Sequence, residues 1–296
     1  MINDLAICAI VGEQDARYYI QDWLSFHRAL GVSHFYLYWN NPLTPPTGDD
    51  LSVKPWPYCG GQIPAYNDFL NKGWKEKYCL ICDIDEFLNY DDSFDLDAVD
   101  FDVMLLNWKI FGSCGETQYK KEPVWERFKT PAPVDAVYND ELPYPVTENW
   151  HVKSIVKNNG KPKVFVNPHN CICAGGKYVN AVGNECRNTP WKTPVWSGAW
   201  LNHYITKSRG EWEARRLNKA DACGNTINID KLERWWRNLN GTKNIKKEVV
   251  EKAVAEFDIS EPIDENLETL KQILATQQAI LVVLNQILNC LPFNKR

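Results

Sequence analysis

Two aspartates and a glutamate follow an apolar run in the first third of the chain. The run and the acids form the segment CLICDIDEF at residues 79–87. If the apolar part is a buried strand, its side chains alternate between faces, so Asp83 and Asp85 point the same way just past its carboxyl end. Carboxylates placed there suit Mg²⁺ or Mn²⁺, which keep open positions for the phosphate oxygens of a substrate. For an isolated Asp-x-Asp, however, an acidic, solvated turn is the commoner explanation.

The composition is that of a globular protein with many tryptophans. Its 296 residues are 44% hydrophobic and 24% charged, which allows one large or two modest domains. The 13 tryptophans favour a carbohydrate or aromatic ligand, because indole rings stack on sugars as well as filling cores. The 33 basic residues are outnumbered by 38 acidic ones, a formal charge of -5 without a long basic run, so a nucleic-acid partner is disfavoured.

The N-terminus and the cysteines predict a cytoplasmic protein. Residues 1–11 lack the basic region of a signal peptide and are too short to span a bilayer, so we expect a first core strand there. Most of the 10 cysteines lie in apolar runs, where a reduced thiol packs as a small hydrophobic group. Cys79 and Cys82 face opposite sides of the expected strand, which argues against a zinc site shared with Cys171 and Cys173.

Strand and helix patterns alternate along the first 110 residues. Apolar runs predict strands at residues 5–11, 34–39, 51–53, 79–83 and 103–108. The spacing of Tyr19, Trp23, Phe26 and Leu30 predicts a helix that Gly31 ends, and another helix is expected over 65–72. This alternation predicts an α/β fold with a mostly parallel sheet flanked by helices. Ligands of such sheets bind beyond the carboxyl ends of the strands.

The next 90 residues are rich in proline, asparagine and aromatic residues. Short strands are expected at residues 152–156 and 163–166, within an irregular segment of the kind that often forms binding loops. Three tryptophans in its last part favour either an aromatic wall for a sugar or a plug at the edge of the core, namely Trp191, Trp196 and Trp200. Helices are expected over residues 208–218, 229–239 and 246–256.

The C-terminal segment carries a heptad pattern. Its leucines and one glutamine recur in steps of three and four at Leu267, Leu270, Leu274, Gln277, Leu281, Leu284, Leu288 and Leu291. Isoleucines widen this stripe, which favours a homo-oligomer of three or more chains joined through residues 262–291. A helix packed on its own domain and a helix in peripheral contact with a membrane surface are the two alternatives.

Five ordered sequence blocks together resemble the glycosyltransferase family 92-like group, and more broadly the inverting GT-A enzymes of the family 2 type. The blocks are Glu13 with Tyr19–Trp23 and His27, then Gln62–Asp68, Asp83–Phe87, Trp108–Ser113, and Asn202–Tyr204 with Lys207 and Ser208. Gly12 stands where that group commonly has asparagine. The resemblance covers about residues 5–220, does not extend to the C-terminal heptads, and implies a Rossmann-like GT-A domain over residues 1–220. From the residue pattern we expect a helical extension over 221–261 and the heptad helix over 262–296.

The resemblance also implies substrates and site residues. It implies a nucleotide-diphosphate-sugar donor, with UDP-sugars favoured, a glycan or glycolipid acceptor, and Mn²⁺ or Mg²⁺ held by Asp83, Asp85 and His203. Donor contacts are implied for Val11, Glu13, Asn40, Gln62, Tyr66, Asn67 and Asp83. Substrate contacts are implied for Trp108, Phe111, Gly112 and Lys207. Glu86 is expected to support the metal ligands from the other side of the strand, and His27 to be structural.

An inverting transferase also needs a general base to deprotonate the acceptor hydroxyl. Glu116 is the first candidate for this role, and Asp140 and Glu141 are the next. Two other functions remain open at this point. One is a nucleotidyltransferase, although residues 12–17 make a poor phosphate loop, and the other is a carbohydrate-binding scaffold assembled through the C-terminal helix.

Overall fold

The computed structural model describes residues 2, 4–58, 61–133, 137–139, 146–169, 171–186, 194–216 and 229–240. The chain divides into two units, Met1–Phe257 and Asp258–Arg296. The second unit, and with it the predicted heptad helix, lies outside the described residues, as does the helix expected over 246–256. Within the described part, no helix is both long and apolar enough to cross a membrane.

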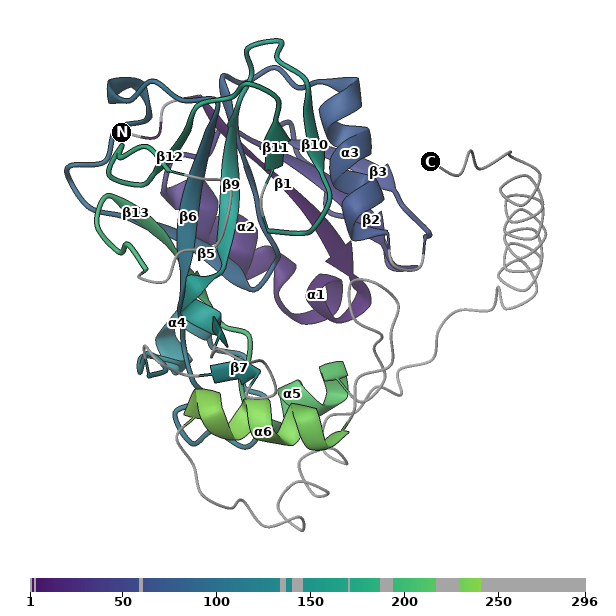
Figure 1. Ribbon diagram of the computed structural model, residues 1–296. Coiled ribbons are helices and arrows are strands. Elements are labelled where there is room, and N and C mark those ends of the chain that lie inside the picture. The colour runs from purple at the N-terminus through teal and green to yellow at the C-terminus, as the bar shows by residue number, and fades with distance from the viewer. Residues whose placement is uncertain are drawn as a thin grey trace, which may run out of the picture. The chain divides into compact units, whose positions relative to one another are not determined.

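A mixed, mostly parallel sheet forms the centre of the described unit (Figure 1). Its nine strands are β1 (Leu5–Gly12), β2 (His34–Asn40), β3 (Leu51–Pro55), β4 (Tyr78–Ile81), β5 (Glu86–Tyr90), β6 (Val103–Ile110), β9 (Val152–Lys157), β12 (Tyr178–Asn180) and β13 (Ala199–His203). The spatial order is β3-β2-β1-β4-β9-β6-β13-β5, with β12 paired to the first half of β6. Two small hairpins lie outside it, β7 (Val137–Asn139) with β8 (Val146–Thr147) and β10 (Lys163–Phe165) with β11 (Cys171–Cys173).

The strand directions bring several strand ends to one edge of the sheet. Strands β1 to β4 are mutually parallel, and β9 runs antiparallel to both β4 and β6. Strands β4 and β6 therefore share a direction, and β13 is parallel to β6. The carboxyl ends of β1, β4, β6 and β13 consequently lie at the same edge, where α/β sheets bind ligands.

Helices cover both faces of the sheet and extend beyond this edge (Figure 1). They are α1 (Glu13–Tyr18), α2 (Ile20–Ala29), α3 (Gln62–Lys72), α4 (Val124–Arg127), α5 (Arg209–Arg216) and α6 (Ile229–Asn240), with 3₁₀ turns at Leu96–Ala98 and Glu148–Trp150. Gly31, with φ of +94°, follows the end of α2 as the sequence predicts. Helices α5 and α6 match the predicted helices 208–218 and 229–239 closely.

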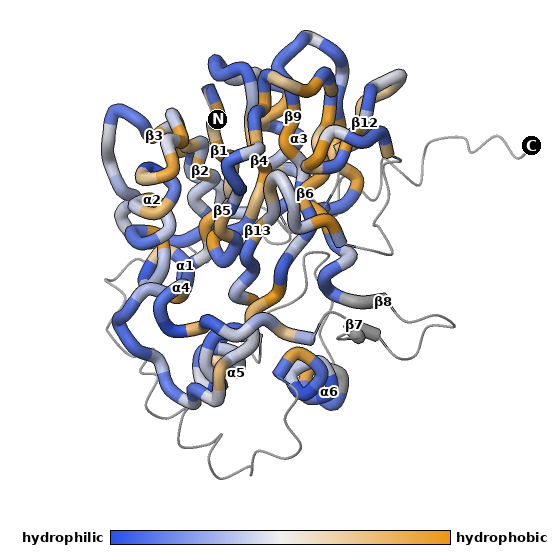
Figure 2. The backbone as a smooth tube through the Cα atoms, turned by 90° about the vertical axis from the view of Figure 1, so that its left-hand side faces the viewer, coloured by the Kyte–Doolittle hydropathy of each residue, from blue (hydrophilic) through white to orange (hydrophobic). Residues whose placement is uncertain are grey.

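Strand alternation produces two separate hydrophobic cores. In β1, residues such as Leu5 and Ile7 pack with α2, whereas Ala6 and Cys8 pack with α3 on the other face. Figure 2 shows the hydrophobic segments gathered along the strands and the hydrophilic ones in the connecting loops. Cys79 and Cys82 belong to different cores, and no zinc-type cysteine cluster occurs in the described part of the chain.

Candidate functional site

The acidic segment forms a tight turn between β4 and β5. The Glu86 amide donates to the Asp83 carbonyl at 3.1 Å, and the Asp83 amide donates to the Glu86 carboxylate at 3.0 Å. Aspartate favours turns because its short side chain bonds nearby backbone in place of a strand partner. The prediction that the strand continues to Asp83 is therefore wrong, since β4 ends at Ile81. The side chains of Asp83 and Asp85 therefore project from a turn and not from one face of a strand.

His203 reaches this turn because β13 lies between β6 and β5. In the antiparallel pairing with β5, His203 lies opposite Glu86, and in the parallel pairing with β6 it lies beside Ile110. The Tyr204 amide then donates to the Asp85 carbonyl at 2.9 Å, which ties the end of β13 to the turn. The position of the imidazole is thus set by sheet pairing.

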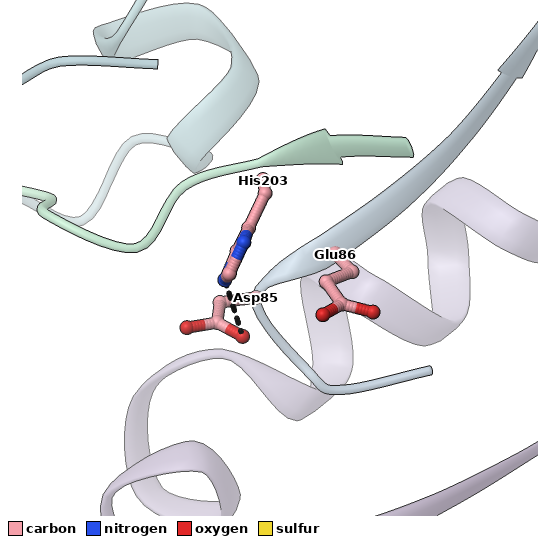
Figure 3. Close-up of side chains that lie close together, drawn as sticks. All are labelled: Asp85, Glu86 and His203. Carbon is pink, nitrogen blue, oxygen red and sulfur yellow. Dashed lines mark ion pairs between the residues drawn. The ribbon is translucent and has the colours of Figure 1, made fainter. Parts of the chain in front are cut away.

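Asp85, Glu86 and His203 form a buried cluster of the metal-ligand type (Figure 3). One ligand atom from each residue lies within 4.8 Å of the other two. His203 Nε2 lies 3.5 Å from Asp85 Oδ1, while its buried Nδ1 has no hydrogen-bond partner among the described residues. Two carboxylates suit Mg²⁺ or Mn²⁺, and the imidazole favours Mn²⁺ of the two. No other cluster of this type occurs among the residues that the structure describes.

A lysine on β9 neutralises one side of the cluster. Lys153 Nζ lies 3.0 Å from Asp83 Oδ2 and 3.5 Å from Glu86 Oε1. The lysine side chain is 1% exposed and that of Glu86 is 0% exposed. Burying such charges is costly unless they are paired, so Lys153 and the two acids form one ionic group.

Lys207 and Arg215 both face Asp85 from the other side. Lys207 Nζ lies 3.6 Å from Asp85 Oδ2 and 4.5 Å from the ring centroid of Tyr19, and it has no hydrogen-bond partner among the described residues. Burial lowers the pKa of Lys207 to about 8, although Asp85 attracts its charge. Lys207 has a backbone φ of +52°. A non-glycine residue keeps such a conformation only where its surroundings require it. Arg215 donates to the same Asp85 oxygen.

A capping box places these two cations. At the start of α5, Ser208 Oγ accepts from the Glu211 amide at 3.3 Å, and the Ser208 amide donates to the Glu211 carboxylate at 3.0 Å. This reciprocal pairing is the Ser-x-x-Glu motif of helix N-termini. Lys207 directly precedes the cap, and Arg215 follows Glu211 by one helical turn. The cap fixes the backbone at the start of α5, and from there both side chains reach Asp85.

Burial and charge move the pKa values of the cluster in different directions. Burial raises the pKa of Glu86 well above its ordinary value. Burial acts on Asp85 in the same direction, but Arg215 and Lys207 hold the pKa of Asp85 well below its ordinary value. Burial lowers the pKa of His203 against the attraction of Asp85, so the imidazole is neutral near pH 7 and keeps a lone pair for a metal.

Asp83 contacts a different set of groups. Its Oδ1 accepts hydrogen bonds from Gln62 Nε2 at 2.6 Å and from the Tyr66 hydroxyl at 2.9 Å, and its Oδ2 faces Lys153. The cluster thus contains Glu86 where the resemblance implies Asp83. The expectation that Glu86 lies on the far side of the strand is wrong, because the turn brings its carboxylate back to the Asp83 amide.

Val11 and Glu13, which the resemblance implies as contacts of the nucleotide-sugar donor, lie near the carboxyl end of β1. The Val11 carbonyl accepts from Asn41 Nδ2 at 3.0 Å. Glu13 begins α1 and pairs with Arg17 at 3.1 Å, one helical turn later. Both residues are at the sheet edge of the cluster, and their polar groups already have partners within the protein.

Asn40 and Asn67, the two asparagines implied as contacts of the sugar donor, also bond to backbone groups of the protein. Asn40 Nδ2 donates to the carbonyls of Trp56 and Tyr58. The Asn67 side chain accepts from the Phe165 amide at 2.7 Å and donates to the Phe165 carbonyl at 2.9 Å, so it joins α3 to β10. These bonds give both asparagines a structural use.

The implied substrate contacts on β6 lie beside His203. The ring centroids of Trp108 and His203 are 4.2 Å apart, and the Phe111 amide donates to the His203 carbonyl at 3.0 Å. Gly112 lines a cavity of 390 Å³ that reaches the end of α6. A Cβ added to Gly112 would lie 3.0 Å from Asn240 Oδ1 and 3.2 Å from the Leu239 carbonyl oxygen, so the end of α6 packs closely on this glycine.

Of the three candidate general bases, Glu116 lies among the described residues. Glu116 pairs with Lys120 at 2.6 Å, and its carbonyl accepts from the Arg209 amide at the start of α5. Asp140 and Glu141 lie outside the described residues. Glu116 is thus close in the fold to α5, but its carboxylate faces a lysine.

The expected aromatic wall is described in part. Lys109 Nζ lies 5.5 Å from the ring centroid of Trp196 and 5.7 Å from that of Trp200. Trp191 lies outside the described residues. The two described indoles therefore flank a lysine, an arrangement that cation–π attraction stabilises.

Several residues of the site were not identified from the sequence. His151 and His169 each have a ring centroid 5.1 Å from that of Trp108, so they pack on the indole ring that lies beside His203. Lys153 lies at a buried position of β9, but that strand also contains Ser154 and Lys157, so its sequence does not mark Lys153. Arg215 has no signal beyond its helical spacing from Glu211. Their contribution depends on tertiary contacts.

No protein-family model matches the chain, and no curated protein sequence matches it.

Proposed function

We propose that the chain is an inverting, metal-dependent glycosyltransferase of the GT-A type. It would transfer a sugar from a nucleotide-diphosphate donor, with UDP-sugars favoured, to a hydroxyl of a glycan or glycolipid. The observation that carries the proposal is the Asp85–Glu86–His203 cluster with Lys207 and Arg215 beside it, at the carboxyl edge of parallel strands. Carboxylates suit a divalent cation there, and the two side-chain cations suit the phosphates that such a cation binds.

Each group then has a separate task. Asp85, Glu86 and His203 would hold Mn²⁺ or Mg²⁺, which supplies Lewis-acid stabilisation of the leaving diphosphate when bound. Lys207 and Arg215 would donate to the diphosphate oxygens and stabilise the charge that develops as the bond between sugar and phosphate breaks. These donors are oriented by the protein before substrate binds, so little reorganisation is needed during the reaction.

The acceptor side of the reaction is assigned from the sequence. We propose Glu116 as the general base, with Asp140 and Glu141 as alternatives. Glu116 must exchange its contact with Lys120 for the acceptor hydroxyl, because a base has to lie within hydrogen-bond reach of the proton it removes. Trp108, Phe111 and Gly112 are the proposed sugar and acceptor contacts.

The test is product release from a panel of UDP- and GDP-sugars with Mn²⁺. Wild-type protein should release a nucleoside diphosphate, and Asp85→Asn should lose at least about 100-fold of that rate, as expected when a group that stabilises the transition state is removed. Asp50→Asn, which changes a carboxylate directly before β3 that pairs with Arg28, is the matched control and should keep the wild-type rate.

The same assay separates the alternatives. Release of pyrophosphate from a nucleoside triphosphate and a sugar phosphate would replace the proposal with a nucleotidyltransferase. The fold gives that alternative little support, since α1 begins at Glu13 directly after β1 and leaves no glycine-rich phosphate loop there. Release of neither product from any donor would favour the carbohydrate-binding scaffold.

A further inference from the structure

Three neighbouring strands share a partly exposed face that the proposed function does not use. Strand β13 pairs with β6 on one side and with β5 on the other (Figure 1). Lys109 of β6 lies beside Asn202, and Asn89 of β5 lies opposite Trp200. These four side chains are partly exposed, whereas the alternate positions of β13 are buried. Because side chains alternate between the faces of a strand, His203 and the metal cluster lie on the other face of β13.

Lys109 lies between two indole rings on this face. Its Nζ is 5.5 Å from the ring centroid of Trp196 and 5.7 Å from that of Trp200. Both distances are near the outer limit of cation–π attraction, about 6 Å, so the ammonium is not centred on either ring. Within the described part of the chain, no carboxylate forms an ion pair with Lys109. By contrast, Lys54, which also lies over an indole ring, pairs with Asp68 at 2.6 Å.

Hydrogen bonds within the protein hold both rings in place. Trp196 Nε1 donates to the Trp108 carbonyl at 2.9 Å, and Trp200 Nε1 donates to Asn202 Oδ1 at 2.9 Å. Neither indole belongs to the two hydrophobic cores of the described residues, which argues against the alternative of a plug at the edge of the core. Rings that are already fixed lose little conformational freedom when a ligand binds.

An amide completes the set of groups on this face. Asn89 Nδ2 donates to the Phe87 carbonyl at 3.0 Å, while its Oδ1 accepts no hydrogen bond from the described residues. A sugar ring can stack its apolar face on an indole, and its hydroxyls can donate to an amide oxygen. An ammonium without a carboxylate partner adds a charge-assisted bond if the sugar carries a carboxylate.

We propose that the face formed by Asn89, Lys109, Trp196 and Trp200 binds a glycan that contains uronic-acid residues. The sugar carboxylate contacts Lys109, and the sugar rings stack on the indoles. The cation between the rings selects an acidic sugar over a neutral one. Because this face lies on the other side of β13 from the metal cluster, binding needs neither metal nor nucleotide, and the inference does not rest on the proposed function.

Saturation-transfer NMR of the full chain compares three ligands in the absence of metal and nucleotide. Tetragalacturonate has both sugar rings and carboxylates, its methyl ester has the same rings without charge, and tetraglutamate has carboxylates without sugar rings. Tetragalacturonate should bind at least about fivefold more tightly than its ester, as expected for one charge pair at a partly exposed site. Tetraglutamate should not compete with it.

Two variants test the residues of the face. Lys109→Met should bind the acid and the ester equally, because the indoles remain and the charge is lost. Trp200→Leu should weaken the binding of both by about fivefold or more, since both ligands stack on the ring. Lys77→Met is the matched control and should keep the wild-type constants, because Lys77 lies 5.2 Å from the ring centroid of Tyr78 but pairs with Asp97. Circular dichroism and urea unfolding establish that each variant is folded.

The outcomes separate this inference from the proposed function. Equal affinity for acid and ester, a wild-type preference in Lys109→Met, equally tight binding of tetraglutamate, or binding of no oligomer would overturn the inference. Unchanged binding of tetragalacturonate in Asp85→Asn supports a face distinct from the metal cluster, and loss of binding there overturns it. A chain that binds tetragalacturonate but releases no nucleoside diphosphate from any donor supports the inference and defeats the proposed function.

Discussion

Replacing Lys153 with methionine should destabilise the protein by about 3–5 kcal/mol at pH 7, the usual loss when one partner of a buried ion pair is removed. The Lys153 side chain is 1% exposed and lies 3.0 Å from Asp83 and 3.5 Å from Glu86. Methionine keeps most of the packing volume but leaves the Glu86 carboxylate buried without its cation. The cost is therefore electrostatic, since little packing is lost.

Urea unfolding of Lys153→Met is compared with Lys157→Met. Lys157 is four residues later on β9, its side chain is 24% exposed, and it lies 3.5 Å from Asp100, which is 81% exposed. An exposed pair of this kind contributes about 1 kcal/mol or less. The result would refute the reasoning if both variants lost the same stability.

The pH dependence of the Lys153→Met effect gives a second check. The folded-state pKa of Glu86 is already raised, and it rises further without Lys153. A carboxyl with a raised folded-state pKa costs no stability below its unfolded-state pKa, and the cost grows as the pH rises from there to the folded-state pKa. The loss in Lys153→Met should therefore be smaller at pH 5 than at pH 8. An equal loss at both pH values would contradict this explanation.

Three further predictions concern other parts of the chain. Stability should fall as the pH drops from 6.5 toward 3, because burial lowers the pKa of His27 to about 3 and the unfolded chain takes up that proton first. Urea unfolding across this range should show a shallower loss in His27→Gln, and equal slopes would contradict the assignment. Gly198→Ala should lower the thermal midpoint more than Gly115→Ala, although φ is +73° and +78° respectively. The new Cβ would collide with the Ala181 carbonyl oxygen at Gly198, whereas at Gly115 nothing lies within 4 Å of it. Equal shifts would show that this contact is unimportant. Light scattering should give the full chain the mass of a trimer or larger assembly and a chain ending near Pro262 a smaller one, and an unchanged mass would exclude assembly through the heptads.

The parallel half of the sheet was predictable because its strands are continuous apolar runs. Strands β1, β2 and β4 are buried on both faces, and each run is followed by turn or helix signals. Strands β5 and β13 were missed as sheet strands for a physical reason. Each is five residues long and mixes polar with apolar positions, and they pair with each other from distant parts of the chain. Such long-range pairing leaves no local signal.

The site was predictable only in part for the same reason. Asp85 and His203 were singled out from their chemistry and from the family resemblance, and the structure brings them together. Glu86 joins them because residues 83–86 form a turn. From the apolar run alone we expected an extended strand end there. Lys153 and Arg215 enter from β9 and α5, and their pairing with the acids depends on the tertiary fold.

The most direct measurement is pulsed EPR of Mn²⁺ added with UDP to the full chain. The spectrum detects nitrogen bonded to the ion, so wild-type protein should show hyperfine coupling to one imidazole. That coupling should disappear in His203→Gln and remain in His34→Gln, which changes a histidine on β2 bonded to the Ser52 hydroxyl. Bound Mn²⁺ without nitrogen coupling, or the same coupling in His203→Gln, would contradict the proposal that Asp85, Glu86 and His203 hold the metal.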